Sequence, residues 1–576
     1  MTAPLSSPFA LLLRRFRLIL VVSAVVGAVS AAGDGVPERR ERGIGPGARL
    51  LEWRRAAGPQ WLQAVEADLG SPLLGVGISV GRGDALGLQP LSQQVSRLAQ
   101  PGRQPIAAVN ADFFFYPSAE QPGIPAGATV LAGEVIRTPF PRSVLILRPG
   151  APPSITLLSA RGSVSAGERT AGLDMVNQPR RTGALVLYTP WFGAGTRTNA
   201  RGTEVVLEPE DRRFRHGVSQ GVRVVEVRPN AGNTGMTAGR WVLSGSGAAA
   251  GFLDTLKAGQ RLELRLDFEP ALGPEDQVVA GGPRLVRDGK AAVEAEGGTL
   301  GGAFAGTRHP RTAVGLAGSR LVLLVVDGRQ PGYSVGMSLT ELAEELVALG
   351  CTDGLNLDGG GSTTLWVRGA VLNRPSDRRE RPVANGLVLF SEAPQEEPIR
   401  LTIMPTEVRA LAGARVKLVV GGEDRHFNPT PLPVPPLRWV LPAELGSVEN
   451  FEFRAAPAVA PPPGAEAVSG QLEATMGALS GRITVRVYPK PAQVFVSPAV
   501  IRVKVGSPTA LQVRAYDTAG NPLELPDDVR WEADPALGQV GPDGILTAAG
   551  EAGKGAVRVT VAGVTAEAPG EVSADR

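Results

Sequence analysis

The sequence of 576 residues predicts an α+β domain, a mixed sheet with a βαβ unit, followed by two all-β sandwiches. Residues 50–392 combine apolar runs of strand length with glycine-rich turns and one clear amphipathic helix, which indicates an α+β domain. From residue 397 onward we find only alternating strand patterns and turns, which are typical of all-β domains. A chain of this length exceeds what one hydrophobic core supports, so several domains are expected.

The first 32 residues have the order of features found in secretory signal peptides. Three arginines between positions 14 and 17 precede an apolar run from Leu18 to Val29, and small residues follow it. This run is shorter than the ~20 residues that a transmembrane helix needs. We therefore expect residues 1–32 to direct export and to be cleaved, with retention as an uncleaved N-terminal membrane anchor as the alternative.

Charge and cysteine content exclude several classes of function. The chain has 59 basic and 56 acidic residues, and the arginines of the N-terminal segment account for the net charge of +3. The remaining chain is neutral, which gives no support to nucleic acid as a partner. The single cysteine, Cys351, rules out an intramolecular disulfide and any multi-cysteine metal site, and we expect it to be buried and inert.

The chain after residue 397 contains an internal repeat with a period of 92 or 93 residues. This period predicts two domains of β-sandwich size, which we place at residues 397–489 and 490–574. The copies resemble bacterial immunoglobulin-like modules, and a spacer or adhesive role, including association with the cell envelope, is the simplest expectation. The repeated residues are Gly413, Asn428, Pro429, Trp439 and Gly446 in the first copy, and Gly506, Asn521, Pro522, Trp531 and Gly538 in the second.

A βαβ unit is expected before the repeats. Leu321–Val326 is an apolar run of strand length, and Leu355–Leu357 is a second, shorter strand. Between them, Ser338 and Glu341 form a capping box ahead of one apolar helix face, and Gly350 stands where a helix-ending glycine belongs. Because a strand, a helix and a strand follow one another so closely, the two strands should be parallel and should end at the same edge of the sheet.

Two aspartates directly follow these strands. Asp327 and Asp358 would lie at the carboxyl end of the sheet, where open parallel sheets place their ligand sites. Each precedes glycine, which lets the backbone turn sharply. After Asp358, Gly359–Gly361 precede Ser362 and Thr363, and successive amides of this kind can form an anion-binding nest. The alternative interpretation is that Asp-Gly only ends each strand with a turn.

Other polar residues follow apolar runs elsewhere in the same region. Pro105–Val109 leads into Asn110, Ala111 and Asp112, whose polar side chains could face a ligand. Arg311 is a candidate for holding a phosphate or carboxylate through its planar guanidinium, with a solvated arginine as the alternative. Three histidines in the whole chain give little support to a histidine-based nucleophile triad.

In this order, the motifs resemble the phosphodiester glycosidase family over residues 48–393. The block Leu355–Thr364, after a helix that ends in glycine, is the most specific part. Ala111 departs from the family, which usually has glycine there, and alanine does not readily adopt positive φ. The matching segments are Asn110–Phe114, Thr196–Asn199 with Gly202 and Glu204, Gly281–Pro283, His309–Gly315, Asp327–Arg329, Ser334 with Gly336, Leu355–Thr364 and Arg381–Asn385.

The resemblance implies hydrolysis of a sugar-1-phosphodiester to free sugar and a phosphate monoester. This reaction needs groups that contact the phosphodiester and a carboxylate that stabilises an oxocarbenium-like centre or activates water. The implied catalytic residues are Asp358, ranked first, with Asp327, Asp112 and Arg311. The implied substrate-binding residues are Asn110, Arg329, Ser334, Gly359, Gly360, Ser362, Thr363 and Gly282.

The expected partner is a glycan or sugar-phosphate substrate, on envelope or extracellular glycopolymers. A non-catalytic carbohydrate-binding surface protein on the same fold is the alternative function. A metal-dependent phosphodiesterase that cleaves the P–O bond would be expected to have more histidines as metal ligands than this chain contains. No cofactor is required by the sequence, although aspartate-rich loops could hold Ca²⁺ or Mg²⁺, and the metal ligands stay unassigned.

Overall fold

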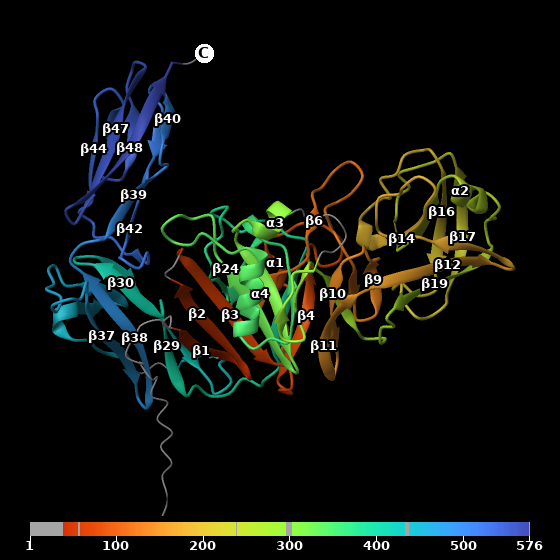
Figure 1. Cartoon of the computed structure of the whole chain (residues 1–576), viewed down its shortest axis with the longest axis horizontal. Helices are drawn as coiled ribbons and strands as arrows, with labels where there is room; N and C mark the ends of the chain where they lie inside the picture. The colour runs from red at the N-terminus through yellow and green to blue at the C-terminus, as the bar shows by residue number, and fades with distance from the viewer. Residues whose placement is uncertain (1–38, 56–57, 238, 295–301, 433–436, 575–576) are drawn as a thin grey trace, which may run out of the picture. The chain divides into compact units, whose positions relative to one another are not determined.

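The computed structural model describes residues 39–55, 58–237, 239–294, 302–432 and 437–574. Figure 1 shows the strands and helices in their order along the chain. The predicted signal segment, residues 1–32, lies outside the described residues. Among the residues that are described, no helix has both the length and the apolar character needed to cross a membrane.

Two sheets, A and B, face each other in the region before the repeats. Sheet A has the strand order β1 (Arg40–Gly45), β2 (Ala48–Arg55), β3 (Gln60–Asp68), β24 (Arg320–Val326), β23 (Arg311–Ala317), β25 (Asp353–Asn356), β21 (Arg284–Arg287), β22 (Lys290–Ala291). Sheet B has the order β27 (Ala370–Val371), β26 (Leu365–Val367), β5 (Gln104–Asn110), β28 (Asn385–Ser391), β4 (Leu74–Val80).

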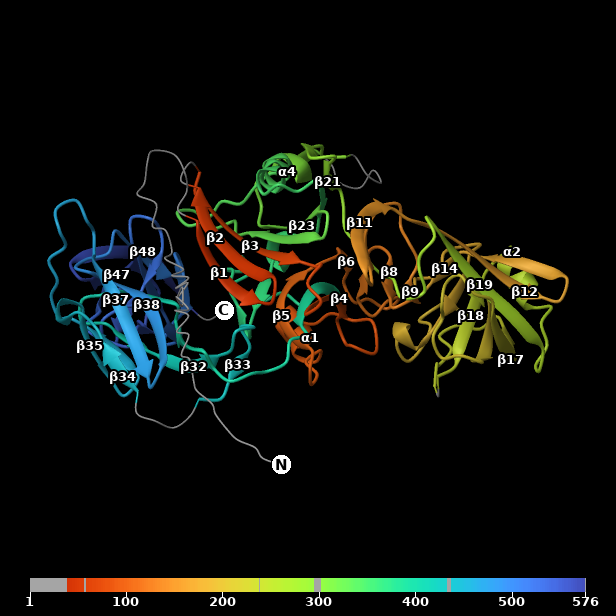
Figure 2. The same ribbon diagram turned by 90° about the horizontal axis from the view of Figure 1, so that it is seen from below.

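Apolar side chains fill three layers around these sheets. Leu323 of β24 and Leu387 of β28 belong to the core between sheets A and B. The outer face of sheet A packs on helix α4 (Leu339–Ala348) through Leu342, and Figure 2 shows this helix over the sheet. Helix α1 (Leu91–Ser96) covers the outer face of sheet B through Leu91 and Val95. The two helices therefore lie on the outside of a sandwich of sheets.

Two further sheets, C and D, share one core that includes Val144, Val278 and Trp241. Sheet C has the order β11 (Ala151–Leu157), β10 (Ser143–Arg148), β20 (Gln277–Ala280), β8 (Thr129–Leu131), β9 (Glu134–Arg137). Sheet D has the order β13 (Arg169–Leu173), β12 (Ser159–Ala166), β19 (Arg261–Glu269), β17 (Gln220–Pro229), β16 (Thr203–Pro209), β18 (Trp241–Gly245), β15 (Leu185–Tyr188), β14 (Met175–Val176). The remaining elements are the pair β6 (Phe114–Phe115) and β7 (Ile124–Pro125), α2 (Ala248–Leu253), α3 (Gly302–Gly306), and the 3-10 turns η1 (Pro190–Phe192), η2 (Gly360–Ser362) and η3 (Ala443–Leu445).

The prediction of an α+β domain with a βαβ unit is wrong. Strands β24 and β25 flank α4 as expected and run in the same direction, but β23 lies between them and pairs with both in antiparallel fashion. The described residues contain four short α-helices, of which the longest, α4, has 10 residues, while strands dominate everywhere else. Local periodicity identified the helix and its flanking strands, but it carries no information about the hairpin strand that inserts between them.

The residues after 397 are all-β, and the two repeats share one strand order. The first module has the sheets β29 (Arg400–Met404), β32 (Val419–Glu423), β33 (Pro429–Thr430); β30 (Glu407–Leu411), β38 (Leu479–Tyr488), β37 (Val468–Met476), β34 (Arg438–Val440); and β31 (Arg415–Lys417), β36 (Glu452–Ala455), β35 (Gly446–Glu449). The second has β39 (Gln493–Ser497), β42 (Gln512–Tyr516), β43 (Pro522–Leu523); β40 (Ile501–Lys504), β48 (Val564–Ser573), β47 (Gly553–Val561), β44 (Arg530–Ala533); and β41 (Pro508–Ala510), β46 (Ile545–Ala548), β45 (Gly538–Val540).

The repeated asparagine has the same structural role in both modules. The backbone N–H of Asn428 donates to Asp424 Oδ1 at 2.9 Å, and that of Asn521 donates to Asp517 Oδ1 at 2.7 Å. Each asparagine side chain also donates to the second oxygen of the same aspartate. The sequence repeat therefore corresponds to a repeated loop in which an aspartate closes a turn.

Cys351 is buried at the end of the α4 segment, as expected from its isolation in the sequence. Its thiol packs against Gly315 of β23, where an added Cβ would lie 2.4 Å from Sγ. Burial raises the pKa of the thiol to about 11, so it stays protonated and unreactive in the folded protein at neutral pH.

Candidate active site

Several strand ends of sheets A and B meet at one edge of the sandwich, and two aspartates lie there on adjoining backbone segments. The N–H of Asp358, just after β25, donates to the carbonyl oxygen of Ala111 at 2.8 Å. Asp112, the residue after Ala111, lies just beyond the end of β5, and its N–H donates to Asn385 Oδ1 at 2.9 Å. These bonds bring Asp112 and Asp358 together, as both were expected to belong to one site.

Asp112 is buried, and one of its two carboxyl oxygens has no partner. Oδ2 accepts a hydrogen bond of 2.7 Å from the N–H of Gly127, whereas Oδ1 accepts none from the residues that the structure describes. Burial raises the pKa of Asp112 to about 7, and the nearby carboxylate of Asp358 adds to this rise, while Gly127 and the guanidinium groups of Arg142 and Arg137 act in the opposite direction. Asp112 can therefore hold a proton near neutral pH.

Asp358 is partly exposed, so a ligand can reach it. Desolvation raises its pKa to about 6. The Ser362 hydroxyl, the positive charge of Arg381, and the N–H of Gly359, which donates to Oδ1 at 2.9 Å, all favour the ionised form. Two neighbouring carboxyl groups with raised pKa values form the arrangement that acid–base chemistry requires.

Arg137 and Arg142 place cationic groups beside these carboxylates. Arg137 is 3 % exposed, and its Nε and Nη1 have no hydrogen-bond partner. Burial lowers the pKa of Arg137 to about 10. The buried Nε and Nη1 of Arg142 also have no partner, and its charge acts on both Asp112 and Asp358. Buried donors without acceptors are costly, so these atoms indicate a place for an anionic ligand.

Arg329 and Arg381 border the loop that carries Asp358. Gly360 has φ +62°, and an added Cβ there would lie 3.0 Å from Arg329 Nη2, so this exposed guanidinium covers the glycine. Arg381 is ion-paired with Asp377, and its Nη1 reaches Ser362 Oγ at 3.5 Å. Arg329 was expected at the site, and the structure places it there with its charge accessible.

Asn110 organises the site through contacts with the protein itself. Its Nδ2 donates to the carbonyl oxygen of Asp358 at 2.6 Å, and its Oδ1 accepts from Thr312 Oγ1 at 2.8 Å and from the N–H of Thr364 at 3.0 Å. The side chain is fully buried. These contacts give Asn110 a positioning role in the structure, and its expected contact with substrate stays a prediction.

The carboxylate of Asp327 is also engaged in hydrogen bonds within the protein. Its two carboxylate oxygens accept hydrogen bonds from Asn373 Nδ2, the N–H of Arg374 and the Tyr333 hydroxyl at 2.9–3.1 Å. Burial still raises the pKa of Asp327 to about 6. Ser334, expected to bind substrate, is buried and donates to the Asp327 carbonyl at 2.6 Å. In the structure both side chains anchor loops, and their expected roles toward substrate stay predictions.

Arg311 does not face a ligand as expected. It is 1 % exposed, and its guanidinium donates to the carbonyl oxygens of Met337, Phe304 and Thr307 at 2.8–2.9 Å. Desolvation lowers the pKa of Arg311 to about 10. The side chain therefore fixes two backbone segments, residues 304–307 and Met337, around the start of β23.

The expected nest of glycine amides is partly occupied by the protein. The N–H of Gly359 bonds Asp358 Oδ1, and that of Gly360 bonds the carbonyl oxygen of Pro310 at 2.9 Å. Gly282 likewise exchanges backbone and side-chain bonds of 2.8 Å with Asn356. Thr363 differs, because its buried Oγ1 has no partner. Of this group, Thr363 and Ser362 keep hydroxyls that line the loop around Asp358.

Sequence reasoning missed Arg137 and Arg142, and it left Arg381 and Asn385 outside the candidate sets. Arg137 and Arg142 flank a short stretch with two prolines and carry no motif with glycine or aspartate. One usable signal was available, since Arg137 ends the apolar run Val135–Ile136, and a buried arginine needs a reason. Within the described residues, no group of three or more His, Cys, Asp or Glu is arranged to hold a metal ion.

Part of this chain matches a known protein family. A family model for phosphodiester glycosidases matches residues 215–390. The resemblance to the phosphodiester glycosidase family is confirmed for this segment. It contains Asp327, Arg329 and Asp358, whereas Asp112, Arg137 and Arg142 precede it and join the site through the fold.

Individual relatives cover different shares of the chain. The SPbeta prophage-derived uncharacterized protein YomE of Bacillus subtilis is 36% identical over 83 residues, which is 14% of this chain and 13% of that protein. A hypothetical protein from Synechocystis has a similar fold, with a TM-score of 0.51 and 20% identity over 62% of this chain and 64% of its own. The catalytic domain of zebrafish N-acetylglucosamine-1-phosphodiester alpha-N-acetylglucosaminidase aligns with a TM-score of 0.28 and 16% identity over 62% of this chain and 88% of that domain.

Proposed function

We propose that this protein is an exported glycosidase that hydrolyses a sugar-1-phosphodiester to free sugar and a phosphate monoester. The observation that carries the proposal is the adjoining pair Asp112 and Asp358, with raised pKa values, beside the unpartnered guanidinium atoms of Arg142. The family match over residues 215–390 supports the same chemistry. Export rests on the pattern of residues 1–32, and envelope or extracellular glycopolymers are the substrate class that an exported enzyme of this kind would meet.

In the proposed reaction, the bond between the anomeric carbon and the phosphate oxygen breaks, and water supplies the new hydroxyl of the sugar. Asp358 acts as the ionised carboxylate, which accepts the proton of the attacking water and stabilises positive charge on the sugar. Asp112 carries a proton on Oδ1, the oxygen without a protein partner, and donates it to the departing phosphate. Arg142, Arg137 and Arg381 balance the charge of the phosphodiester.

The test is incubation with a sugar-1-phosphate alkyl diester and identification of both products. Free sugar with alkyl phosphate supports the proposal. Sugar phosphate with alcohol would mean that the P–O bond is cleaved, and no turnover would favour the alternative of a non-catalytic carbohydrate-binding protein.

The matched variants are Asp358→Asn and Asp267→Asn. Asp358→Asn should lower kcat/KM by about 100-fold or more while Tm stays within about 2 °C of the wild type. Asp267, whose side chain is 46% exposed and paired with Arg265, lies away from the site on β19, and its variant should keep full activity. Full activity in Asp358→Asn would remove this residue from the catalytic set.

A further inference from the structure

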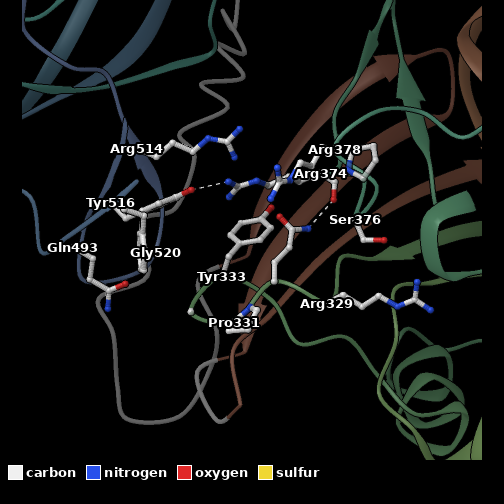
Figure 3. A pocket seen from close by; sticks show the side chains of 14 residues that line it. Arg329, Pro331, Tyr333, Arg374, Ser376, Arg378, Gln493, Arg514, Tyr516 and Gly520 are labelled. Carbon is white, nitrogen blue, oxygen red and sulfur yellow. Dashed lines mark hydrogen bonds between the residues drawn. The ribbon is translucent and has the colours of Figure 1, made fainter. Parts of the chain in front are cut away.

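A cavity of about 400 Å³ is lined in part by Arg329, a residue of the candidate active site. It lies between the loops 329–333 and 374–378, which follow β24 and β27, and strands β39 and β42 of the second module (Figure 3). Its walls therefore come from two parts of the chain that the sequence predicts to be separate domains. A spacer module would not be expected to complete a cavity of this size.

The cavity is lined by four arginines, namely Arg329, Arg374, Arg378 and Arg514. Its lining includes no acidic residue among those that the structure describes, and no ion pair joins any of the four to a described carboxylate. Arginines at other places in the chain commonly have such partners, as Arg381 has in Asp377 and Arg409 has in Asp517. Arg374 also acts on the buried carboxylate of Asp327, and the excess of cations around the cavity creates a positive potential that attracts an anion.

Arg374 is held in a defined position within this cavity. Its guanidinium lies between two aromatic rings, 4.9 Å from the centroid of Tyr333 and 5.5 Å from that of Tyr516. Its Nη2 also donates to the Tyr516 hydroxyl at 2.6 Å, the contact drawn in Figure 3. Fixed guanidinium groups lose less entropy when they bind an anion. The nearby Ser376 has a buried hydroxyl without a partner, which leaves it available to a ligand.

Arg329 links the cavity to the loop of the candidate active site. This residue lines the cavity, and in Figure 3 its side chain extends away from Tyr516. The guanidinium lies against Gly360, two residues after Asp358. Tyr333 makes a second link, because its hydroxyl bonds Asp327 at 2.9 Å. A polymer whose scissile bond lies at Asp358 would pass Arg329 and enter the cavity.

We propose that this cavity is a subsite for an anionic group of a glycan, one or more sugar units away from the bond that is cleaved. The inference rests on the proposed function for its place along the substrate, and it makes the second module part of substrate binding. The charge on the glycan is a phosphodiester or a carboxylate, since arginine binds both through its planar fork. Aromatic rings beside the cations, including the half-exposed Phe495, suit the apolar faces of sugar rings.

The kinetic experiment compares two substrates with the double variant Arg378→Gln/Arg514→Gln, whose two arginines are exposed and distant from the reacting carboxylates in the sequence. With a monomeric sugar-1-phosphate alkyl diester, the variant should match the wild type. With an oligomer of glycosyl phosphate units, kcat/KM should fall about tenfold, mainly through KM. The control is Arg502→Gln, an exposed arginine on β40 outside the cavity. Equal loss in the control, or no loss in the double variant, would overturn the proposal.

The binding experiment does not depend on turnover. The Asp358→Asn chain is titrated with the glycosyl phosphate oligomer, a polyuronate, a neutral glucan and single-stranded DNA. The same titrations are repeated with the cavity variant, in which Asp358→Asn is combined with Arg378→Gln/Arg514→Gln. If either anionic glycan binds the cavity variant about tenfold more weakly, the subsite is supported, even if the wild type cleaves nothing. The two anionic polymers distinguish recognition of phosphate from recognition of carboxylate. The proposal would be overturned if the neutral glucan or DNA bound most tightly. It would also be overturned if the anionic glycans bound the cavity variant as tightly as the Asp358→Asn chain.

Discussion

Asp112 and Arg311 are both ionisable side chains that burial removes from water, yet their surroundings give them different roles. Arg311 donates to three carbonyl oxygens, so its charge is used within the protein. Asp112 keeps one oxygen without any donor, and Arg142 keeps two nitrogens without any acceptor. A buried polar atom without a partner costs about 1–3 kcal/mol, so the second arrangement is expected where a ligand or water supplies the partner.

The pH dependence of activity follows from the two raised pKa values. If Asp358 must be ionised and Asp112 protonated, kcat/KM should rise as pH passes about 6 and fall as it passes about 7. The measurement is a pH–rate profile between about pH 4.5 and 9. Residual activity of Asp112→Asn should lack the fall at high pH. A wild-type rate that stays flat above neutral pH would contradict the role of Asp112 as an acid.

Arg142 and Arg311 should differ in what their loss affects. Arg142→Gln should lower kcat/KM at least about tenfold and lower the free energy of unfolding by less than about 1 kcal/mol, because its guanidinium contacts the rings of Phe113 and Phe140 but its buried Nε and Nη1 have no hydrogen-bond partner among the described residues. Arg311→Gln should lower the free energy of unfolding by about 2 kcal/mol or more, because three carbonyl oxygens lose a charged donor. Urea unfolding and steady-state kinetics measure both effects. The opposite pattern would reverse the two assignments.

Helix α4 shows what the sequence determines at the scale of one element. Its capping box forms as predicted, with the Glu341 N–H donating to Ser338 Oγ at 3.2 Å and the Ser338 N–H donating to Glu341 Oε2 at 2.9 Å. Its apolar face packs on sheet A through Leu342 and Leu346. Such features depend on residues within one or two turns, which is why a single sequence reveals them.

Ser338→Ala tests the contribution of this cap. Loss of the hydroxyl leaves the N–H of Glu341 without its acceptor, so the free energy of unfolding should fall by about 1 kcal/mol. Ser338→Asp should restore most of the loss, because aspartate also accepts at this position. Equilibrium urea unfolding gives the values. An unchanged midpoint in Ser338→Ala would mean that the cap does not stabilise the domain.

Strand order and site membership depend on contacts between distant residues, and here the sequence was informative only in part. β23 joins β24 through a hairpin and pairs on its other side with β25. The pairing with β25 joins residues that are distant in the sequence, so local sequence patterns do not predict it. The same limit applies to the site. Asp358 and Asp112 each stand after a strand and were found, whereas the engagement of Asp327 by Asn373 and Arg374 arises from a loop far along the chain.

At the scale of the whole molecule, a buried ionic cluster joins the two modules. Asp517 of the second module accepts from Arg409 Nη1 at 3.0 Å and from the Tyr488 hydroxyl at 3.1 Å, both of the first module. Arg409 also pairs with Glu407, which in turn pairs with Arg40 of β1. The module that completes the arginine-lined cavity is thus attached to its neighbour by charged groups removed from water.

Asp517→Asn should destabilise this junction. Removal of one partner of a buried pair costs about 3 kcal/mol, because the remaining cation loses part of its compensation. Asp527→Asn is the matched control, since Asp527 pairs with Arg415 across the same two modules but is 77% exposed, and its loss should cost about 0.5 kcal/mol or less. Calorimetry of the full chain should show a lower transition temperature for Asp517→Asn alone. Equal shifts in both variants would show that burial of the pair is unimportant.

The single thiol of Cys351 can report local separation of the elements that bury it. The side chain lies between α4 and β23, the strand that begins at Arg311 and pairs with β25. A thiol reagent can modify it only when these elements separate, so the labelling rate measures the free energy of that opening at one defined place. Substrate that fills the neighbouring site would slow the labelling, which allows binding to be followed without any assay of turnover.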